Sequence, residues 1–266
     1  MGAQIARNRA VSASSRPSSF RVLIAFVILF ALYQSAEGLG ARLLGSFAVQ
    51  AGLMITMVLA AWPVGRWLGY RGYDAYGLDL RGRSFRLLVA MLLLAVAAKG
   101  IAILAGLHGG IYAFAPWSEG GAASLGGLFA SVALSTFIPS IAEDMLTRGF
   151  LLRAANPGFG GPVFVLASAA LFTANHIYRF DSGITEQLRL FVMGLAYAAA
   201  AWRWRTLWGA VGLHWGYNLA GGLSDPLISA VAESAVAGRW LTIAVHLALL
   251  AVILLIPLDR RDQAPS

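Results

Sequence analysis

Apolar residues gather into eight long runs along this chain, separated by short polar segments. Most of these runs are long enough to cross the hydrocarbon core of a bilayer, which needs about 20 helical residues. The runs cover residues 22–44, 46–68, 86–107, 122–153, 160–178, 187–203, 206–222 and 239–257. This pattern predicts an all-α, polytopic membrane protein of about eight transmembrane helices.

Composition supports the bilayer as the main solvent of this chain. Apolar residues make up 59% of its 266 residues and charged residues only 12%, whereas a soluble domain carries roughly 25% charged residues. The mean hydropathy of +0.71 points the same way. Membrane lipids are therefore the expected partners. The chain has no cysteine, which excludes thiol catalysis and zinc bound by cysteine.

The arginines are distributed unevenly between the two sides of the predicted membrane domain. If the N-terminus lies inside, most arginines fall in the inner segments, and the outer segments hold only Arg42, Arg179, Arg189 and Arg239. Because positive charge favours cytoplasmic segments, both ends of the chain are expected in the cytoplasm. The net charge of +8 is spread between the apolar runs and forms no single patch, so we expect contact with anionic headgroups and no nucleic-acid partner.

The apolar pattern also defines the predicted domain organisation. Residues 1–19 are polar and rich in Ser and Arg, which predicts a disordered cytoplasmic N-terminus. Residues 20–258 are expected to form a single transmembrane domain with its functional core at about 122–222, and residues 259–266 are expected to form a C-terminal tail. The excess of Arg over Lys and the high Ala content favour a multi-pass protein of a bacterial inner (plasma) membrane.

The fourth run contains an acidic pair followed by an arginine. Charged side chains within a span are costly, so such residues are functional candidates. Glu143 and Asp144 are adjacent, and Arg148 follows Asp144 by four residues. At helical spacing Asp144 and Arg148 share a face and can form an ion pair, which leaves Glu143 available as a general base. The structural alternative is an ordinary salt bridge at a helix end.

Two further polar motifs lie in the fifth and seventh runs. One is Phe172-x-x-x-His176, and the other is His214-x-x-x-Asn218. Because residues four apart lie on one helix face, His214 and Asn218 can point at the same place. Two such donors can stabilise an oxyanion. The structural alternatives are a histidine that only supports a helix end and hydrogen bonds that join neighbouring helices.

The expected depths of these residues connect the three motifs. With a rise of 1.5 Å per residue, Glu143 lies roughly 15 Å and His176 roughly 21 Å from the inner ends of their helices. His214 and Asn218 lie roughly 12 and 18 Å in by the same reasoning. All four side chains therefore fall in one layer near the middle of the membrane, which predicts a single site.

The three motifs, in this order, resemble the CPBP family of intramembrane proteases, which includes the type II CAAX prenyl endopeptidases. The family pattern is Glu-Glu-x-x-x-Arg, then Phe-x-x-x-His, then His-x-x-x-Asn. The resemblance covers residues 122–222, and the chain departs from the pattern at Asp144, where the family usually has Glu.

The resemblance implies the roles of the site residues. Glu143 and His176 would activate a water molecule, and His214 with Asn218 would stabilise the oxyanion of a tetrahedral intermediate. Arg148 would order the acidic pair, so Asp144 and Arg148 are supporting residues. The implied enzyme is a glutamic-type intramembrane endopeptidase acting on a peptide or membrane-protein substrate. No cofactor or metal is expected, although a glutamate and two histidines could also bind zinc.

Two other functions remain open at this point. Glu37 and Lys99 lie within apolar runs and could line the path of a small-solute transporter, but no pair of similar broken helices indicates two repeats. The chain could also be a catalytically silent relative that acts as an immunity or scaffold protein. His246, in the last run, is a lone histidine without a partner motif.

Overall fold

A computed structural model describes residues 17–79, 82–114, 125–155, 158–230 and 235–257. Helices make up most of this part of the chain, and the exceptions include two strands of three residues each. The predicted all-α class is thereby confirmed. The predicted disordered N-terminus, apart from residues 17–19, lies outside the described residues. The C-terminal tail and the first residues of the predicted core, 122–124, lie outside them as well.

The described chain contains eight helices of 15 residues or more, one for each apolar run. They are α2 (Ser19–Ser35), α3 (Phe47–Trp67), α4 (Gly82–His108), α5 (Leu125–Asp144), α6 (Gly161–Asn175), α7 (Ile184–Trp204), α8 (Trp208–Ser224) and α9 (Ala235–Leu255). Two π-helices extend them, with η1 (Ala36–Leu43) following α2 and η3 (Met145–Ala154) following α5. Two 3₁₀-helices, η2 (Tyr73–Tyr76) and η4 (Ile177–Ser182), lie between long helices.

Five helical segments of the described residues are long and apolar enough to cross a membrane. They are Ser19–Leu43, Phe47–Trp67, Gly82–His108, Gly126–Ala154 and Ala235–Leu255. The other three long helices, α6 to α8, fall outside this set, although α8 carries two candidate site residues and α6 ends just before a third, His176. These five segments confirm a polytopic membrane protein, whereas the count of eight spans stays a prediction.

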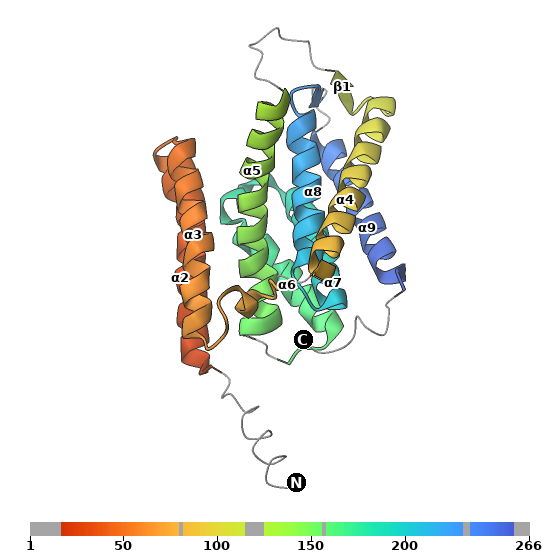
Figure 1. Ribbon diagram of the computed structural model, residues 1–266. Coiled ribbons are helices and arrows are strands. Elements are labelled where there is room, and N and C mark those ends of the chain that lie inside the picture. The colour runs from red at the N-terminus through yellow and green to blue at the C-terminus, as the bar shows by residue number, and fades with distance from the viewer. Residues whose placement is uncertain (1–16, 80–81, 115–124, 156–157, 231–234, 258–266) are drawn as a thin grey trace, which may run out of the picture.

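The long helices run up and down between two ends of a bundle (Figure 1). We call the end where α2 begins and α9 ends the base, and the opposite end the top. At the top, β1 (Tyr112–Phe114) pairs antiparallel with β2 (Ile228–Ala230). The described bundle thus starts with α2 and finishes with α9 at the same end, the base. This agrees with an even number of membrane crossings. Which side faces the cytoplasm stays a prediction.

The centre of the bundle is formed by α7 and α8. The alanines of α7 from Ala196 to Ala201 are almost fully buried. The peripheral helices instead expose large apolar side chains, among them Phe47 on α3 and Leu104 on α4, each 68% exposed. An apolar outer surface of this kind suits contact with lipid tails and not with water. The chain is therefore an integral membrane protein.

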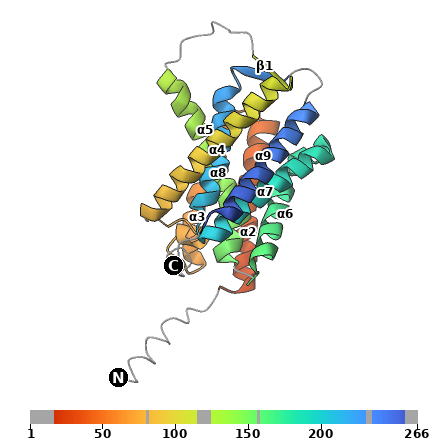
Figure 2. The same cartoon turned by 90° about the vertical axis from the view of Figure 1, so that its right-hand side faces the viewer.

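Two glycines allow α8 to approach α4 closely. A Cβ atom added at Gly212 would lie 2.5 Å from the carbonyl oxygen of Leu88, and one at Gly216 would lie 2.5 Å from that of Leu92. Small residues four apart permit such backbone contact between membrane helices. This packing sets the position of α8, which carries His214 and Asn218. In Figure 2, α4 runs diagonally across α8.

Candidate active site

The acidic pair lies where α5 changes into a π-helix. Glu143 and Asp144 are the last two residues of α5, and η3 begins at Met145. Glu143 is 5% exposed and Asp144 is fully buried. A π-helical turn is less regular than an α-helical one, and such turns occur frequently at functional sites. Both carboxylates therefore lie inside the protein at an irregular point of the helix.

Arg148 forms the predicted ion pair with Asp144. Its Nη1 atom donates to Asp144 Oδ1, and both side chains are fully buried. The same Nη1 lies 3.1 Å from Thr147 Oγ1. The guanidinium also stacks over two aromatic rings, 4.4 Å from the centroid of Phe172 and 5.2 Å from that of Tyr197. Arg148 balances the charge of Asp144. The carboxylate of Glu143 is therefore left to interact with the two histidines.

His214 lies between the two acids. Its Nδ1 is 3.1 Å from Asp144 Oδ1, and its Nε2 is 3.9 Å from Glu143 Oε2. A carboxylate oxygen only accepts hydrogen bonds, so the bond to Asp144 assigns a proton to Nδ1. Asp144 therefore fixes the orientation of the His214 ring and directs its Nε2 atom toward Glu143.

His176 reaches the other oxygen of Glu143 from the end of α6. Its Nδ1 lies 2.8 Å from the carbonyl oxygen of Phe172 and 3.5 Å from Glu143 Oε1. The carbonyl oxygen accepts, so Nδ1 carries the proton and Nε2 is available to a water molecule or substrate. The sequence predicted a span over residues 160–178, but α6 ends at Asn175 after 15 residues. This early end places His176 beside Glu143.

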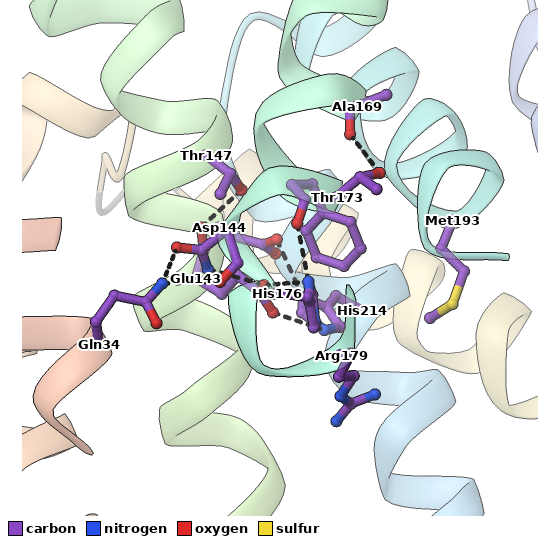
Figure 3. Close-up of polar contacts among 12 residues, drawn as sticks. Gln34, Glu143, Asp144, Thr147, Ala169, Thr173, His176, Arg179, Met193 and His214 are labelled. Atoms are coloured by element: carbon purple, nitrogen blue, oxygen red, sulfur yellow. Dashed lines mark hydrogen bonds and ion pairs between the residues drawn. The ribbon is translucent and has the colours of Figure 1, made fainter. Parts of the chain in front are cut away.

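Asn218 lies one helical turn beyond His214 on α8. Its Nδ2 donates to Ser140 Oγ over 3.2 Å, and Ser140 precedes Glu143 by three residues on α5. The Asn218 side chain is partly buried, as is that of His176. Among the predicted residues, Glu143, His176 and His214 are brought into mutual proximity, while Asn218 is held against the same helix one turn away. Figure 3 shows Glu143 facing both histidines.

Phe172 has several neighbours in this site. Its ring lies 4.8 Å from the His176 ring and 5.8 Å from the His214 ring, centroid to centroid, in edge-on contacts. It also covers the guanidinium of Arg148. One aromatic ring thus contacts both histidines and the buried cation, which gives a packing reason for an aromatic residue four positions before His176.

Sequence reasoning missed two pairs of residues around this site. Asn175 donates to Glu143 Oε1 over 3.1 Å, and Gln34 of α2 donates to Asn175. Tyr197 stacks on the His214 ring at 5.0 Å, and its hydroxyl lies 2.9 Å from His246 Nε2. His246 is named in the sequence analysis without an assigned role, and the cost of a polar side chain in an apolar span would have singled out Gln34 as well. Their partners, however, could not be read from the sequence.

The site geometry resembles a hydrogen-bonding network more than a metal centre. Among the described residues, no group of three or more His, Cys, Asp or Glu side chains is arranged to hold a metal ion. The Nδ1 atoms of His176 and His214 both have hydrogen-bond partners. The absence of metal dependence stays a prediction that needs a chemical test.

Comparison with protein families adds an independent observation. Residues 125–220 match the family described as type II CAAX prenyl endopeptidase Rce1-like. Over this segment the chain is similar to that family. It runs from α5 into α8 and includes every predicted site residue, so the resemblance based on three motifs is confirmed. The type II CAAX endopeptidase family is a family of proteases, which places this membrane protein among hydrolases. No curated protein matches the chain.

Proposed function

We propose that this protein is an active intramembrane endopeptidase in which Glu143 activates the attacking water. The observation that carries the proposal is the convergence on one buried carboxylate of two histidines from different helices. His176 approaches Oε1 at 3.5 Å, and His214 approaches Oε2 at 3.9 Å. A carboxylate and two imidazoles held this close suit general acid–base chemistry. They also lie in a segment that matches a protease family.

The first step is the attack of water on the carbonyl carbon of the scissile peptide bond. Glu143 takes one proton from the water molecule, and the new C–O bond places negative charge on the former carbonyl oxygen. His176 Nε2 is the nitrogen available to hold the same water molecule, because its Nδ1 donates to Phe172. The partly exposed His176 ring allows water to reach the buried carboxylate.

His214 and Asn218 stabilise the oxyanion in this proposal. The Asn218 amide has a second N–H besides the one used for Ser140. His214 already donates from Nδ1 to Asp144, so donation from Nε2 to an oxyanion requires the imidazolium form. The carboxylates of Asp144 and Glu143 lie on the two sides of this ring, 3.1 Å from Nδ1 and 3.9 Å from Nε2.

Collapse of the intermediate breaks the C–N bond. The leaving amine takes the proton that Glu143 received from water, and the products are a carboxylic acid and an amine. The charge of Asp144 stays paired with Arg148 throughout, since both are fully buried. This arrangement keeps one acidic group, Glu143, free to exchange protons with the substrate.

The proposed substrate is a peptide or a segment of a membrane protein that enters from the bilayer. The name of the matched family refers to CAAX prenyl proteins, and prenylation of the substrate is one form that this class can take. The proposed location is a bacterial inner membrane, based on the Ala-rich composition and the excess of Arg over Lys.

The test is cleavage of a fluorogenic peptide library by purified protein in proteoliposomes. Glu143→Gln keeps the size of the side chain and removes the base, and we expect its cleavage rate to fall by about a hundredfold or more. His214→Ala is expected to be similarly impaired. His108→Ala, at the exposed end of α4, is the matched control for loss of a histidine.

The outcomes separate the competing functions. Cleavage by Glu143→Gln at the wild-type rate would overturn the mechanism. A catalytically silent scaffold would give a different result. The wild-type protein would cleave no library member but would bind peptides, and Glu143→Gln would not alter the binding affinity. A transporter is less well supported, because Glu37 pairs with Arg42 near the top, while Lys99 lies over the ring of Tyr217 on another helix.

A further inference from the structure

Gln34 is a buried amide on a mostly apolar helix. It is 8% exposed, and the other buried residues of α2 are Ala25 and Leu29. A strongly polar side chain is costly within a membrane span unless it serves an interaction or a function. Gln34 lies outside the matched segment 125–220, so the family comparison assigns it no role.

The Gln34 amide nitrogen donates twice to one residue of α6. Its Nε2 atom lies 2.7 Å from the carbonyl oxygen of Asn175 and 2.9 Å from Asn175 Oδ1. An amide nitrogen has two N–H groups and donates both here. The first bond satisfies a carbonyl at the end of α6, where helical partners are missing. The second bond reaches the side chain of Asn175.

This second bond determines which way the Asn175 amide faces. Because Gln34 Nε2 only donates, the Asn175 oxygen must point toward Gln34, and the Asn175 nitrogen must point away from it. That nitrogen lies 3.1 Å from Glu143 Oε1 and donates to it. A flipped Asn175 would place nitrogen against nitrogen and oxygen against carboxylate, so two contacts would become repulsive. The bonds therefore form a directed chain from Gln34 through Asn175 to Glu143.

The continuation of α2 holds the same junction between α6 and η4. Arg42 of η1 donates to the carbonyl oxygen of Tyr178 over 2.9 Å, and its guanidinium lies 4.7 Å from the centroid of the Tyr178 ring. Gly38 packs against this ring so closely that an added Cβ atom would be 2.2 Å from the Tyr178 hydroxyl. The first span thus contacts the chain on both sides of His176.

We propose that Gln34 is a positioning residue, which fixes the Asn175 amide so that Asn175 donates a hydrogen bond to the Glu143 carboxylate. The bond stabilises the ionised carboxylate and holds Oε1 next to His176. This role rests on the proposed function, because it affects catalysis only if Glu143 is the base. The first span then completes an active site whose reacting groups all come from the matched segment.

Other groups around Glu143 would stay in place when Gln34 is replaced. Those that face or adjoin the carboxylate are Tyr33 of α2, Asp144 and Arg148 of α5 and η3, His176 after α6, and His214 of α8. A substitution at Gln34 removes none of these charges or titratable groups. A change in the pH dependence of the variant is therefore attributable to the altered Asn175 contact.

The test compares Gln34→Met with a neighbouring control. Met is close to Gln in size but cannot donate, so the Asn175 amide becomes free to turn. We expect kcat to fall about tenfold, with KM unchanged, as for a misplaced catalytic group. The acid limb of the pH–rate profile should move to higher pH, because a carboxylate that loses a donor is protonated more easily. Ser35→Ala, whose hydroxyl donates only to Leu32 of its own helix, should behave like wild type.

Two variants of Asn175 show whether Gln34 acts through this residue. In an Asn175→Leu background, Gln34→Met should have no further effect on kcat, because the intermediate amide is already missing. Asn175→Asp keeps the acceptor for Gln34 but turns an oxygen toward Glu143, so its acid limb should move further than that of Gln34→Met. Additive losses in the double variant, or a Gln34→Met profile equal to that of Ser35→Ala, would overturn the proposal.

A spectroscopic measurement separates this proposal from the proposed function. The infrared band of the protonated Glu143 carboxyl is assigned by difference from Glu143→Gln, and the pH at which it appears is recorded without substrate. Gln34→Met should move this pH upward even if no peptide is cleaved. If the band of Gln34→Met appears at the same pH as that of wild type, the positioning role is contradicted. If the band of Gln34→Met is shifted but wild-type protein cleaves no peptide, only the proposed function is contradicted. A residue that only joined helices would lower thermal stability and leave the band in place.

Discussion

The imidazole of His214 lies 3.1 Å from the carboxylate of Asp144, through its Nδ1 atom and the Asp144 Oδ1 atom. The same Asp144 oxygen accepts from Arg148, so one acid links a buried cation to a candidate catalytic histidine. This contact joins the first and third sequence motifs directly. It gives Asp144 a structural role that depends on its charge, and several predictions about the site depend on it.

Removal of Asp144 should destabilise the protein strongly. Asp144→Ala leaves the fully buried guanidinium of Arg148 without its counter-charge, which costs about 3–5 kcal/mol in comparable buried pairs. The free energy of unfolding is measured by denaturant titration in mixed micelles. Glu37→Ala, which breaks the exposed pair with Arg42, is the control and should cost at most about 1 kcal/mol. Equal losses in the two variants would contradict a buried role for Asp144.

Lengthening the same acid should be tolerated. Asp144→Glu retains the negative charge that pairs with Arg148, and glutamate is the residue usual at this position in the family that the motifs resemble. We expect peptide cleavage to be preserved in Asp144→Glu and lost in Asp144→Asn, which removes the charge. The measurement is the cleavage rate of each purified variant. A fully active Asp144→Asn would show that the contact with His214 needs no ionised acid.

The Tyr197 ring and hydroxyl should have separable effects. Tyr197 stacks on His214 and bonds to His246, whose Nδ1 is 2.9 Å from the carbonyl oxygen of Thr242. Tyr197→Phe keeps the stacked ring but leaves His246 Nε2 without a donor, so stability should fall by about 1–3 kcal/mol while kcat changes little. Tyr197→Leu removes the ring, and kcat should fall as well. Unfolding and cleavage assays on both variants check this. A larger loss of kcat in Tyr197→Phe than in Tyr197→Leu would show that catalysis depends on the hydroxyl and not on the ring.

Close packing of α8 on α4 should be sensitive to a single methyl group. Gly216→Ala places a Cβ atom 2.5 Å from the carbonyl oxygen of Leu92, so α8 must shift and move His214 and Asn218 with it. Gly221→Ala on the same helix meets only the end of the flexible Lys99 side chain, at 3.6 Å. We expect a lower melting temperature and slower cleavage for Gly216→Ala and no change for Gly221→Ala. Matching behaviour of the two variants would mean that the α4–α8 contact does not set the site.

Chelators should leave the cleavage rate unchanged. His176 and His214 use their Nδ1 atoms for hydrogen bonds to Phe172 and Asp144, and each approaches a different oxygen of Glu143. We expect protein dialysed against a strong chelator to cleave peptide as fast as untreated protein. Loss of activity on dialysis, followed by recovery on addition of zinc alone, would establish a metal-dependent mechanism instead.

Local spacing was enough to predict part of this site. Asp144 and Arg148 are four residues apart, and their ion pair follows from the pitch of a helix whatever surrounds it. His214 and Asn218 share a face of α8 for the same reason. The order of the three motifs also predicted the protease family, which the match over residues 125–220 confirms. The long apolar runs predicted the membrane helices, because backbone groups in a bilayer must bond within their own segment.

Tertiary structure alone decided which side chains meet. Gln34 and His246 are buried polar residues in mostly apolar helices, and a sequence indicates their cost but not their partners. Gln34 contacts Asn175 across 141 positions of the chain, and Tyr197 contacts His246 across 49. Such contacts depend on how helices pack side by side, which local spacing does not encode. The early end of α6, which brings His176 beside Glu143, likewise depends on the surrounding helices that accommodate its last carbonyl groups.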